Sequence, residues 1–286
     1  MNVKIKRTCL LLAAGVVAIS LSAGGRLGLA GAEGAEAEPD QKAAQSEGGQ
    51  PRQVAIVIDD FGNNMNGTEE MLNLPIKFTV AVMPFMPTTK QDAEEAHRLG
   101  HDVIVHMPME PNKGLKSWLG PGAITTDMSD AEIRKRVEEA INEVPHAIGM
   151  NNHMGSKVTA DERVMRVVLQ VCKERGLFFL DSRTTFKTVV PKVTQELGVP
   201  LVSNDVFLDD VYTEAHISKQ IGIVRKFLEQ HDNCVVIGHV GVPGKKTAAV
   251  LRQSIPAMQS NEHVQFVKAA DMLSPSPSDP FILPNP

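Results

Sequence analysis

Short apolar runs alternate with helical segments along most of the chain, and this alternation constrains the fold more than any other feature. Expected strands are residues 54–58, 77–82, 102–106, 146–150, 177–181, 200–203, 234–239 and 264–267. Strands joined through helices pair in parallel, with right-handed crossovers that place the helices outside. The glycine fingerprint of a dinucleotide-binding sheet is missing after the first strand. We therefore predict an α/β fold, a single irregular (β/α) barrel of seven or eight parallel strands with outer helices.

Particular residues mark where the helices are expected to begin and end. Ser129 and Thr159 each precede a Glu by three residues, as in the capping box that opens a helix. Glycines at positions 100, 176 and 198 stand where helices are expected to stop. The remaining helices are expected at about 89–99, 187–197, 214–231 and 247–260.

The first fifty residues are expected to lie outside the folded domain. Residues 1–30 combine a basic start with a short apolar run, which is typical of a signal peptide or an N-terminal anchor. Residues 31–51 are small and acidic and should form a disordered linker. The barrel domain is then 52–273, followed by a proline-rich tail at 274–286. We expect an exported protein of the periplasm or cell envelope, with membrane contact only through an uncleaved N-terminal segment.

The amino-acid composition limits the classes of molecule that this protein is expected to bind. A net charge of -5 and a pI near 6.0, without a basic cluster, argue against nucleic acid. One Trp and one Tyr are few for an aromatic sugar-binding surface, so a sugar would be held mainly by polar contacts. Cys172 and Cys234 could pair in an oxidising compartment or remain separately buried thiols.

Polar side chains stand at the ends of six expected strands, where an apolar strand does not require them. They are Asp59-Asp60, His106, Asn151-Asn152-His153, Asp181-Ser182-Arg183, Asn204-Asp205 and His239. For Asp59 and Asp60 alone, the simpler alternative is that one acid caps the next helix and the other is solvated. Because the carboxyl ends of barrel strands meet at one face, the whole set predicts a metal-assisted or acid-base site there.

Residue chemistry suggests separate roles within this set. Successive side chains of a regular strand point to opposite faces, so the two adjacent acids should differ in role. Asp60, His106 and His153 supply one carboxylate and two imidazoles, a set suited to a divalent metal, with zinc preferred. Asp59 could accept a proton from water, and His239 could protonate a leaving amine. Arg183 is a further catalytic candidate, because it could hold the base or a substrate anion.

At these residues the chain resembles the divergent polysaccharide deacetylases, relatives of the metal-dependent carbohydrate esterases. The markers are Ile58-Asp-Asp-Phe-Gly62, His106-Met-Pro-Met-Glu-Pro111, Gly149-Met-Asn-Asn-His-Met-Gly-Ser156, Leu180-Asp-Ser-Arg-Thr184 and Ile237-Gly-His239. The resemblance implies that Asp59 is the catalytic base, Asp60 a metal ligand and His239 the acid. It implies an N-acetylated polysaccharide or oligosaccharide as partner.

One departure concerns the second metal motif, in which the parent esterases carry two histidines four residues apart. Here Glu110 occupies the second position. Either Glu110 is a ligand, or His153 replaces the lost imidazole, and we predict His153. Asn152, Asp181 and Asp205 are additional site candidates.

The sequence thus predicts an exported, metal-dependent hydrolase that removes N-acetyl groups from a cell-envelope sugar. Two alternatives stay open. One is a catalytically inactive barrel that binds envelope glycan or a protein partner, suggested by motifs missing relative to the parent esterases and by the few aromatic residues. The other is a metallo-phosphoesterase on the same scaffold, suggested by the Asp-Asp pair.

Overall fold

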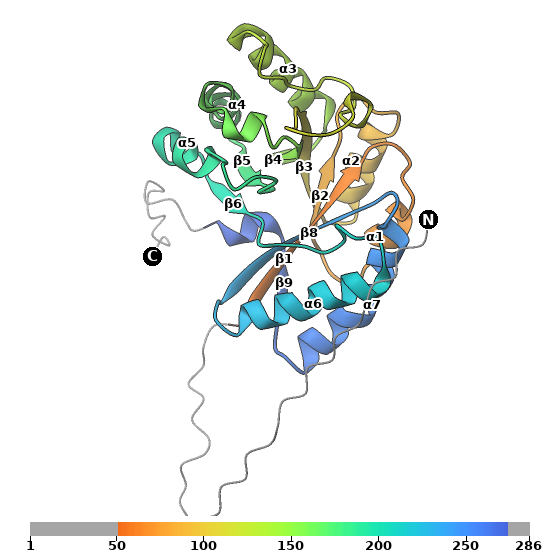
Figure 1. Cartoon of the computed structure of the whole chain (residues 1–286). Coiled ribbons are helices and arrows are strands. Elements are labelled where there is room, and N and C mark those ends of the chain that lie inside the picture. The colour runs from red at the N-terminus through yellow and green to blue at the C-terminus, as the bar shows by residue number, and fades with distance from the viewer. Residues whose placement is uncertain (1–50, 274–286) are drawn as a thin grey trace, which may run out of the picture. The chain divides into compact units, whose positions relative to one another are not determined.

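The computed structural model describes residues 51–273 (Figure 1). The expected leader, the proline-rich tail and all but the last residue of the expected linker lie outside this range. Between residues 51 and 273, no helix is both long enough and apolar enough to cross a membrane.

The strands and helices alternate along the described range. The strands are β1 (Gln53–Phe61), β2 (Thr79–Val82), β3 (Asp102–Met109), β4 (Ala147–Met154), β5 (Phe178–Asp181), β6 (Leu201–Ser203), β7 (Val206–Phe207), β8 (Asn233–His239) and β9 (Gln265–Val267). The α-helices are α1 (Thr68–Leu72), α2 (Thr89–Arg98), α3 (Asp130–Glu143), α4 (Glu162–Glu174), α5 (Val190–Leu197), α6 (Glu214–Leu228) and α7 (Gly244–Ser260). Short 3-10 helices are η1 (Lys116–Trp118), η2 (Val158–Ala160) and η3 (Ala269–Met272).

All paired strands run parallel in one sheet, in the order β6-β5-β4-β3-β2-β1-β8-β7. β8 pairs with one edge of β1. The other edge of β1 pairs with β9 at Gln53–Ala55 and with β2 at Val57–Phe61. The sheet curls into a half-barrel with helices around it (Figure 1). Among the described residues, no backbone pairing joins β6 to β7, so the barrel is not closed. The predicted (β/α) barrel is confirmed.

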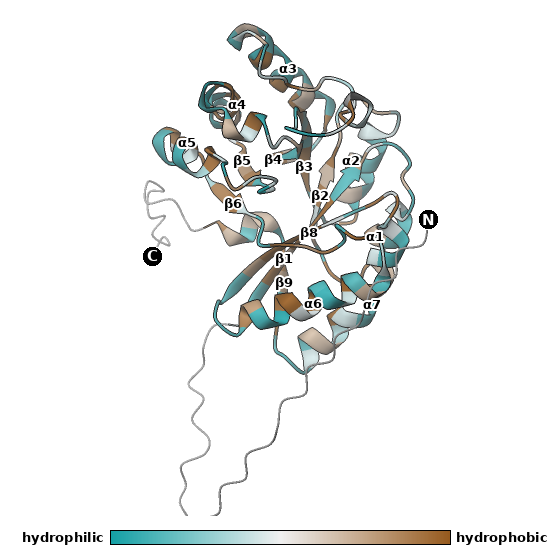
Figure 2. Ribbon diagram, viewed as in Figure 1, coloured by the Kyte–Doolittle hydropathy of each residue, from teal (hydrophilic) through white to brown (hydrophobic). Residues whose placement is uncertain are grey.

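The strands are buried on both faces, which explains their continuous apolar runs. Along β1, Val54, Ile56 and Ile58 pack in the outer core against the helices, whereas Ala55 and Val57 belong to a smaller core inside the half-barrel. Figure 2 shows predominantly apolar strands surrounded by helices that carry many hydrophilic residues. Side-chain alternation therefore sets which residues reach the interior.

All eight expected strands are present, and three extend further than expected. β1 continues to Phe61, so Asp59 and Asp60 lie within it. β3 continues to Met109 and β4 to Met154, so His106 and the Asn-Asn-His run lie within strands rather than after them. β7 is an additional strand. With two residues it is too short to produce a recognisable sequence period.

The first residues of helices α3 and α4 are fixed by side chains that accept hydrogen bonds from first-turn amides. Ser129 caps α3 by accepting from the Glu132 amide, as expected. The predicted cap at Thr159 is wrong, because its hydroxyl donates to the Gly155 carbonyl and Asp161 caps α4 instead. Asp161 stands directly before the helix, where its short carboxylate reaches the first-turn amides.

Cys172 and Cys234 are both buried free thiols. The structure thus selects the second of the two alternatives left open by the sequence. Burial raises the pKa of each thiol to about 12, so both remain protonated in the neutral range.

Candidate active site and metal centre

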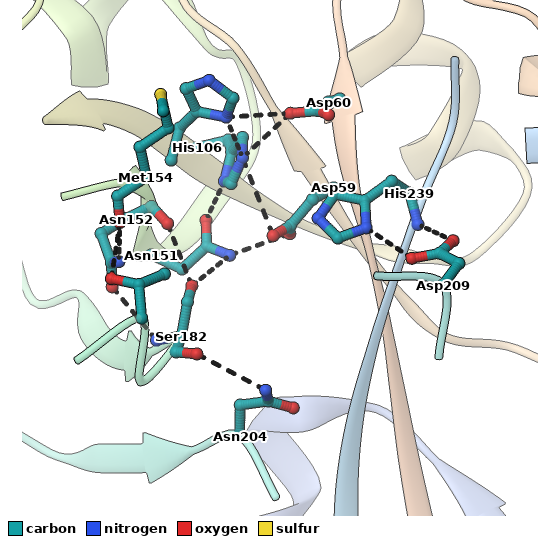
Figure 3. A network of polar contacts seen from close by, with 12 residues as sticks. Asp59, Asp60, His106, Asn151, Asn152, Met154, Ser182, Asn204, Asp209 and His239 are labelled. Atoms are coloured by element: carbon teal, nitrogen blue, oxygen red, sulfur yellow. Dashed lines mark hydrogen bonds and ion pairs between the residues drawn. The ribbon is translucent and has the colours of Figure 1, made fainter. Parts of the chain in front are cut away.

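The inner-facing positions of the strands place the site above the inner core. Ala55 and Val57 of β1 line that core, and the next inner position is Asp59. Counting two residues onward from an inner-core residue gives the same result on other strands. It leads from Ile104 to His106 on β3, from Leu180 to Ser182 after β5 and from Ile237 to His239 on β8. Each strand therefore changes from apolar to polar at the same level of the half-barrel. Figure 3 shows the resulting network.

Asp60 reaches the same site through a local break in β1. Its φ of 70° is in the left-handed region, and the register with β2 shifts between Ile58 and Phe61. In a regular strand Asp60 would point away from Asp59. The irregularity turns both carboxylates toward the pocket, which strand alternation alone could not predict.

Three potential ligand atoms meet beside Asp59. Asp60 Oδ1 lies 3.2 Å from His106 Nε2 and 3.0 Å from His153 Nδ1. The two ring nitrogens are 3.1 Å apart. Asp60, His106 and His153 are the cluster among residues 51–273 whose donor atoms are close enough to share one metal ion. Tetrahedral ligands about 2.1 Å from an ion stand about 3.4 Å apart, close to these separations.

The opposite ring nitrogens determine where the lone pairs point. His106 Nδ1 lies 2.7 Å from Asn151 Oδ1, and the Asn151 amide group donates to Asp59 Oδ1 at 2.9 Å. His106 Nδ1 must therefore be the donor, which leaves a lone pair on Nε2 of the neutral ring. His153 Nε2 likewise donates to the Trp118 carbonyl at 3.0 Å, which leaves a lone pair on Nδ1.

Two imidazole lone pairs and a carboxylate oxygen thus face one another, and positive charge is needed between them. Asp60 Oδ1 is buried and receives no hydrogen bond from a described residue. Burial raises the pKa of Asp60, but hydrogen bonds and positive charge from the protonated forms of His106 and His153 hold it well below its ordinary value. When both rings are neutral, a bound cation would supply that positive charge instead. This donor set fits a borderline divalent cation.

Asp59 is a buried carboxylate with one oxygen tied down. Asn151 holds Oδ1, whereas Oδ2 lies 3.7 Å from His106 Nε2, and the residue lines the pocket. Burial raises the pKa of Asp59, although His106 and His239 counteract this effect. A raised pKa brings a carboxylate closer to the range in which a general base works.

His239 faces Asp59 from the adjoining strand, since the two residues pair in register between β1 and β8. Asp209 accepts from the His239 backbone amide at 2.9 Å and lies 2.7 Å from Nδ1. Thr247 also donates to Asp209 at 2.7 Å. Burial favours the neutral imidazole, but the Asp209 carboxylate prevails and raises the pKa of His239 to about 9. His239 is therefore a protonated acid in the neutral range.

These groups line one open pocket of about 370 Å³. Its polar floor contains Asp59, Asp60 and the site histidines, and apolar side chains form much of its wall. The apolar lining residues are Met65, Trp118, Met154, Phe207, Val240, Val242 and Pro243. A charged floor below an apolar wall suits a ligand with a polar reacting group.

Arg183 does not reach Asp59, which corrects the first of its two predicted roles, that of holding the base; its role toward a substrate anion stays a prediction. It follows β5 with a left-handed φ of 54°, and its guanidinium lies 3.8 Å from Asp205 and 3.3 Å from the Asn204 carbonyl. The partner of Asp59 is Asn151 instead. Arg183 thus links β5 to the connection between β6 and β7.

Three additional candidates make structural bonds away from the pocket lining. Glu110 accepts from Thr126 and pairs with Lys157 at 2.8 Å. Asp181 accepts from the Arg183 amide and the Thr188 hydroxyl. Asp205 accepts from the Val235 amide.

Asn152, the fourth candidate, does line the pocket. Its side chain accepts from the Ser182 amide at 3.1 Å and donates to the Met154 carbonyl at 2.8 Å. It joins β4 to the end of β5.

The sequence prediction missed two functional positions. Asp209 follows the unpredicted strand β7, so the acidic pair at Asp209-Asp210 was not recognised as a strand end. Trp118 ends the short 3-10 helix η1 after β3, and nothing in its local sequence indicates the contact with His153.

Fold and site together define a (β/α) barrel protein with a polar pocket and a candidate metal centre at the carboxyl ends of its strands. The chain belongs to the divergent polysaccharide deacetylase family, whose model matches residues 56–273.

Two relatives and one solved structure are similar to this chain. An uncharacterized protein of Haemophilus influenzae is 36% identical over 233 residues, covering 80% of this chain and 81% of its own length. The uncharacterized protein YibQ of Escherichia coli K12 is 36% identical over 221 residues, covering 77% of this chain and 67% of its own. A solved structure of an uncharacterized protein from Agrobacterium tumefaciens C58 superposes with a TM-score of 0.72 at 18% identity, covering 79% of this chain and 90% of its own. This last similarity supports the fold.

Proposed function

We propose that the chain is an exported, metal-dependent amide hydrolase that removes N-acetyl groups from a cell-envelope polysaccharide or oligosaccharide. The observation that carries this proposal is the convergence of Asp60, His106 and His153 beside a buried carboxylate and a charged imidazole. Family membership supports a carbohydrate substrate.

Asp60, His106 and His153 would hold the divalent ion, with zinc the preferred identity for one carboxylate and two imidazoles. When bound, the ion supplies Lewis acidity that polarises an amide carbonyl. Asn151 and the Trp118 carbonyl keep both imidazoles in the tautomers that direct lone pairs to this point.

Asp59 and His239 supply the proton transfers. Asp59 lines the pocket, and its Oδ2 atom, which Asn151 does not hold, takes a proton from water as the water oxygen bonds to the carbonyl carbon. His239 carries a proton in the neutral range and gives it to the amide nitrogen as the C–N bond breaks. The products are acetate and a free amine.

Acetate release from an N-acetylated oligosaccharide by the zinc-loaded chain tests this proposal. Asp59→Asn should reduce release at least about a hundredfold, because the amide cannot accept the proton. Bound zinc should remain, since Asp59 is outside the ligand cluster. Release that continues unchanged in Asp59→Asn would exclude Asp59 as the base.

A further inference from the structure

The only tryptophan and the only tyrosine of the chain both line the candidate active-site pocket. Trp118 is 61% exposed and Tyr212 is 51% exposed. Aromatic side chains usually gain stability by burying their large apolar faces. Two half-exposed rings beside one polar pocket therefore indicate a ligand with apolar faces of its own.

The rings flank the reacting groups. Trp118 belongs to η1 after β3, whereas Tyr212 lies between β7 and α6. In the sheet order, β2, β1 and β8 separate β3 from β7. The end of β1, with Asp59 and Asp60, consequently lies between the strands that present the two rings.

Both aromatic residues are fixed through their backbones. The Trp118 carbonyl accepts from His153 Nε2 at 3.0 Å, and the Tyr212 carbonyl accepts from Lys246 Nζ at 2.9 Å. These bonds position the residues without using their rings. Substitution of either side chain can thus remove a ring while the backbone contact remains.

On the basis of the proposed function, we propose that Trp118 and Tyr212 are stacking platforms for sugar units on either side of the N-acetylated unit that reacts. Pyranose rings present apolar C–H faces that pack on aromatic rings, and their hydroxyl groups remain solvated at an open pocket. The acetamido group of the central unit then extends to the polar floor. The occupant is a chain of at least three sugar units.

The pocket walls favour a glycan over a lipid surface. Asp209 and Asp210 line the pocket close to Tyr212, and the chain carries a net charge of -5, so anionic headgroups are disfavoured. Phe186, fully exposed and outside the pocket lining, would be the natural contact for a membrane. It provides a matched aromatic control.

Because Trp118 is the only tryptophan, intrinsic tryptophan fluorescence reports on one platform directly. The protein is the full zinc-loaded chain carrying Asp59→Asn, which suppresses turnover. It is titrated first with N-acetylglucosamine and then with the β-1,4-linked tetramer of that sugar. The tetramer should change the emission and bind at least about tenfold more tightly than the monomer, because it reaches a platform as well as the floor.

Calorimetry then compares variants in the same background. Trp118→Ala and Tyr212→Ala should each weaken tetramer binding about tenfold, with zinc content and monomer binding unchanged. Trp118→Phe should restore most of the affinity, whereas Phe186→Ala should have no effect. An unchanged emission, equal affinities for monomer and tetramer, or an emission shift produced only by phosphatidylglycerol vesicles would overturn the proposal.

Failure of the proposed function gives a different pattern. Length-dependent binding that requires both rings, without acetate release by the wild-type chain, would exclude deacetylation and leave the platforms in place. Acetate release from the tetramer with a wild-type KM in both alanine variants would exclude the platforms and leave the reaction in place.

Discussion

His106 Nε2 and His153 Nδ1 lie 3.1 Å apart, and the far nitrogen of each ring contacts a hydrogen-bond acceptor. Asn151 binds the His106 ring and the carboxylate of Asp59 at once. One amide side chain therefore orients a candidate metal ligand and the candidate base. This arrangement accounts for a polar residue that is fully buried in β4.

Replacing Asn151 with Leu should lower zinc affinity about 10- to 100-fold, because the ring of His106 loses the bond that fixes its tautomer. The measurement is a competition titration with a zinc chelator. Asn152→Leu is the matched control, since Asn152 is equally buried but bonds Ser182 and Met154 instead of a ligand. Equal loss of zinc in both variants, or none in Asn151→Leu, would contradict this role.

The pH dependence should show the charged state of His239. Its pKa is raised to about 9, so acetate release should fall as the pH rises through a value no higher than 9, because a bound cation lowers that pKa. Asp209→Asn removes the anion that raises the pKa and should move the falling limb toward neutral pH. A limb at the same pH in wild type and Asp209→Asn would rule out His239 as the acid.

The ion pair between His239 and Asp209 also affects the stability of the fold. The folded-state pKa of His239 lies above its ordinary value of 6.5, so the ion pair stabilises the fold fully below about pH 6.5. That contribution is lost as the pH rises toward 9. Urea titrations between pH 6 and pH 9 should show a smaller decrease in unfolding free energy for His239→Gln than for wild type. An equal decrease in both would exclude this contribution.

Two glycines provide a steric comparison. A Cβ at Gly149 in β4 would lie 2.6 Å from the Phe178 ring, so Gly149→Ala should destabilise the fold by about 1–3 kcal/mol. At Gly222 in α6, nothing lies within 4 Å of an added Cβ. Gly222→Ala should stabilise the fold by about 0.5–1 kcal/mol, because alanine has the higher helix propensity. Thermal unfolding of both variants checks these opposite signs.

Residues that follow strand periodicity could be predicted from the sequence. The apolar runs defined the strands, and counting two residues onward from an inner core position leads to Asp59, His106 and His239. Other placements depend on tertiary structure. The left-handed φ of Asp60 and the direction of Arg183 could not be read from local sequence, because neither follows the strand alternation.

Partners joined across the sheet were equally inaccessible. Asp209 follows a strand of two residues, and its bond to His239 joins positions 30 residues apart. Glu110 matched a family position by spacing, yet its carboxylate lies against Thr126 and Lys157. Spacing along the chain did not determine which side chain faced the pocket.

Zinc stoichiometry of the purified chain and of two variants tests the central claim most directly. The wild-type chain and Glu110→Gln should each retain about one ion per chain after dialysis, whereas His153→Ala should lose it, because His153 contributes a donor atom to the cluster and Glu110 does not. Circular dichroism would verify that each variant is folded. A wild-type chain without bound metal, or a His153→Ala variant that keeps its ion while Glu110→Gln loses it, would contradict the account.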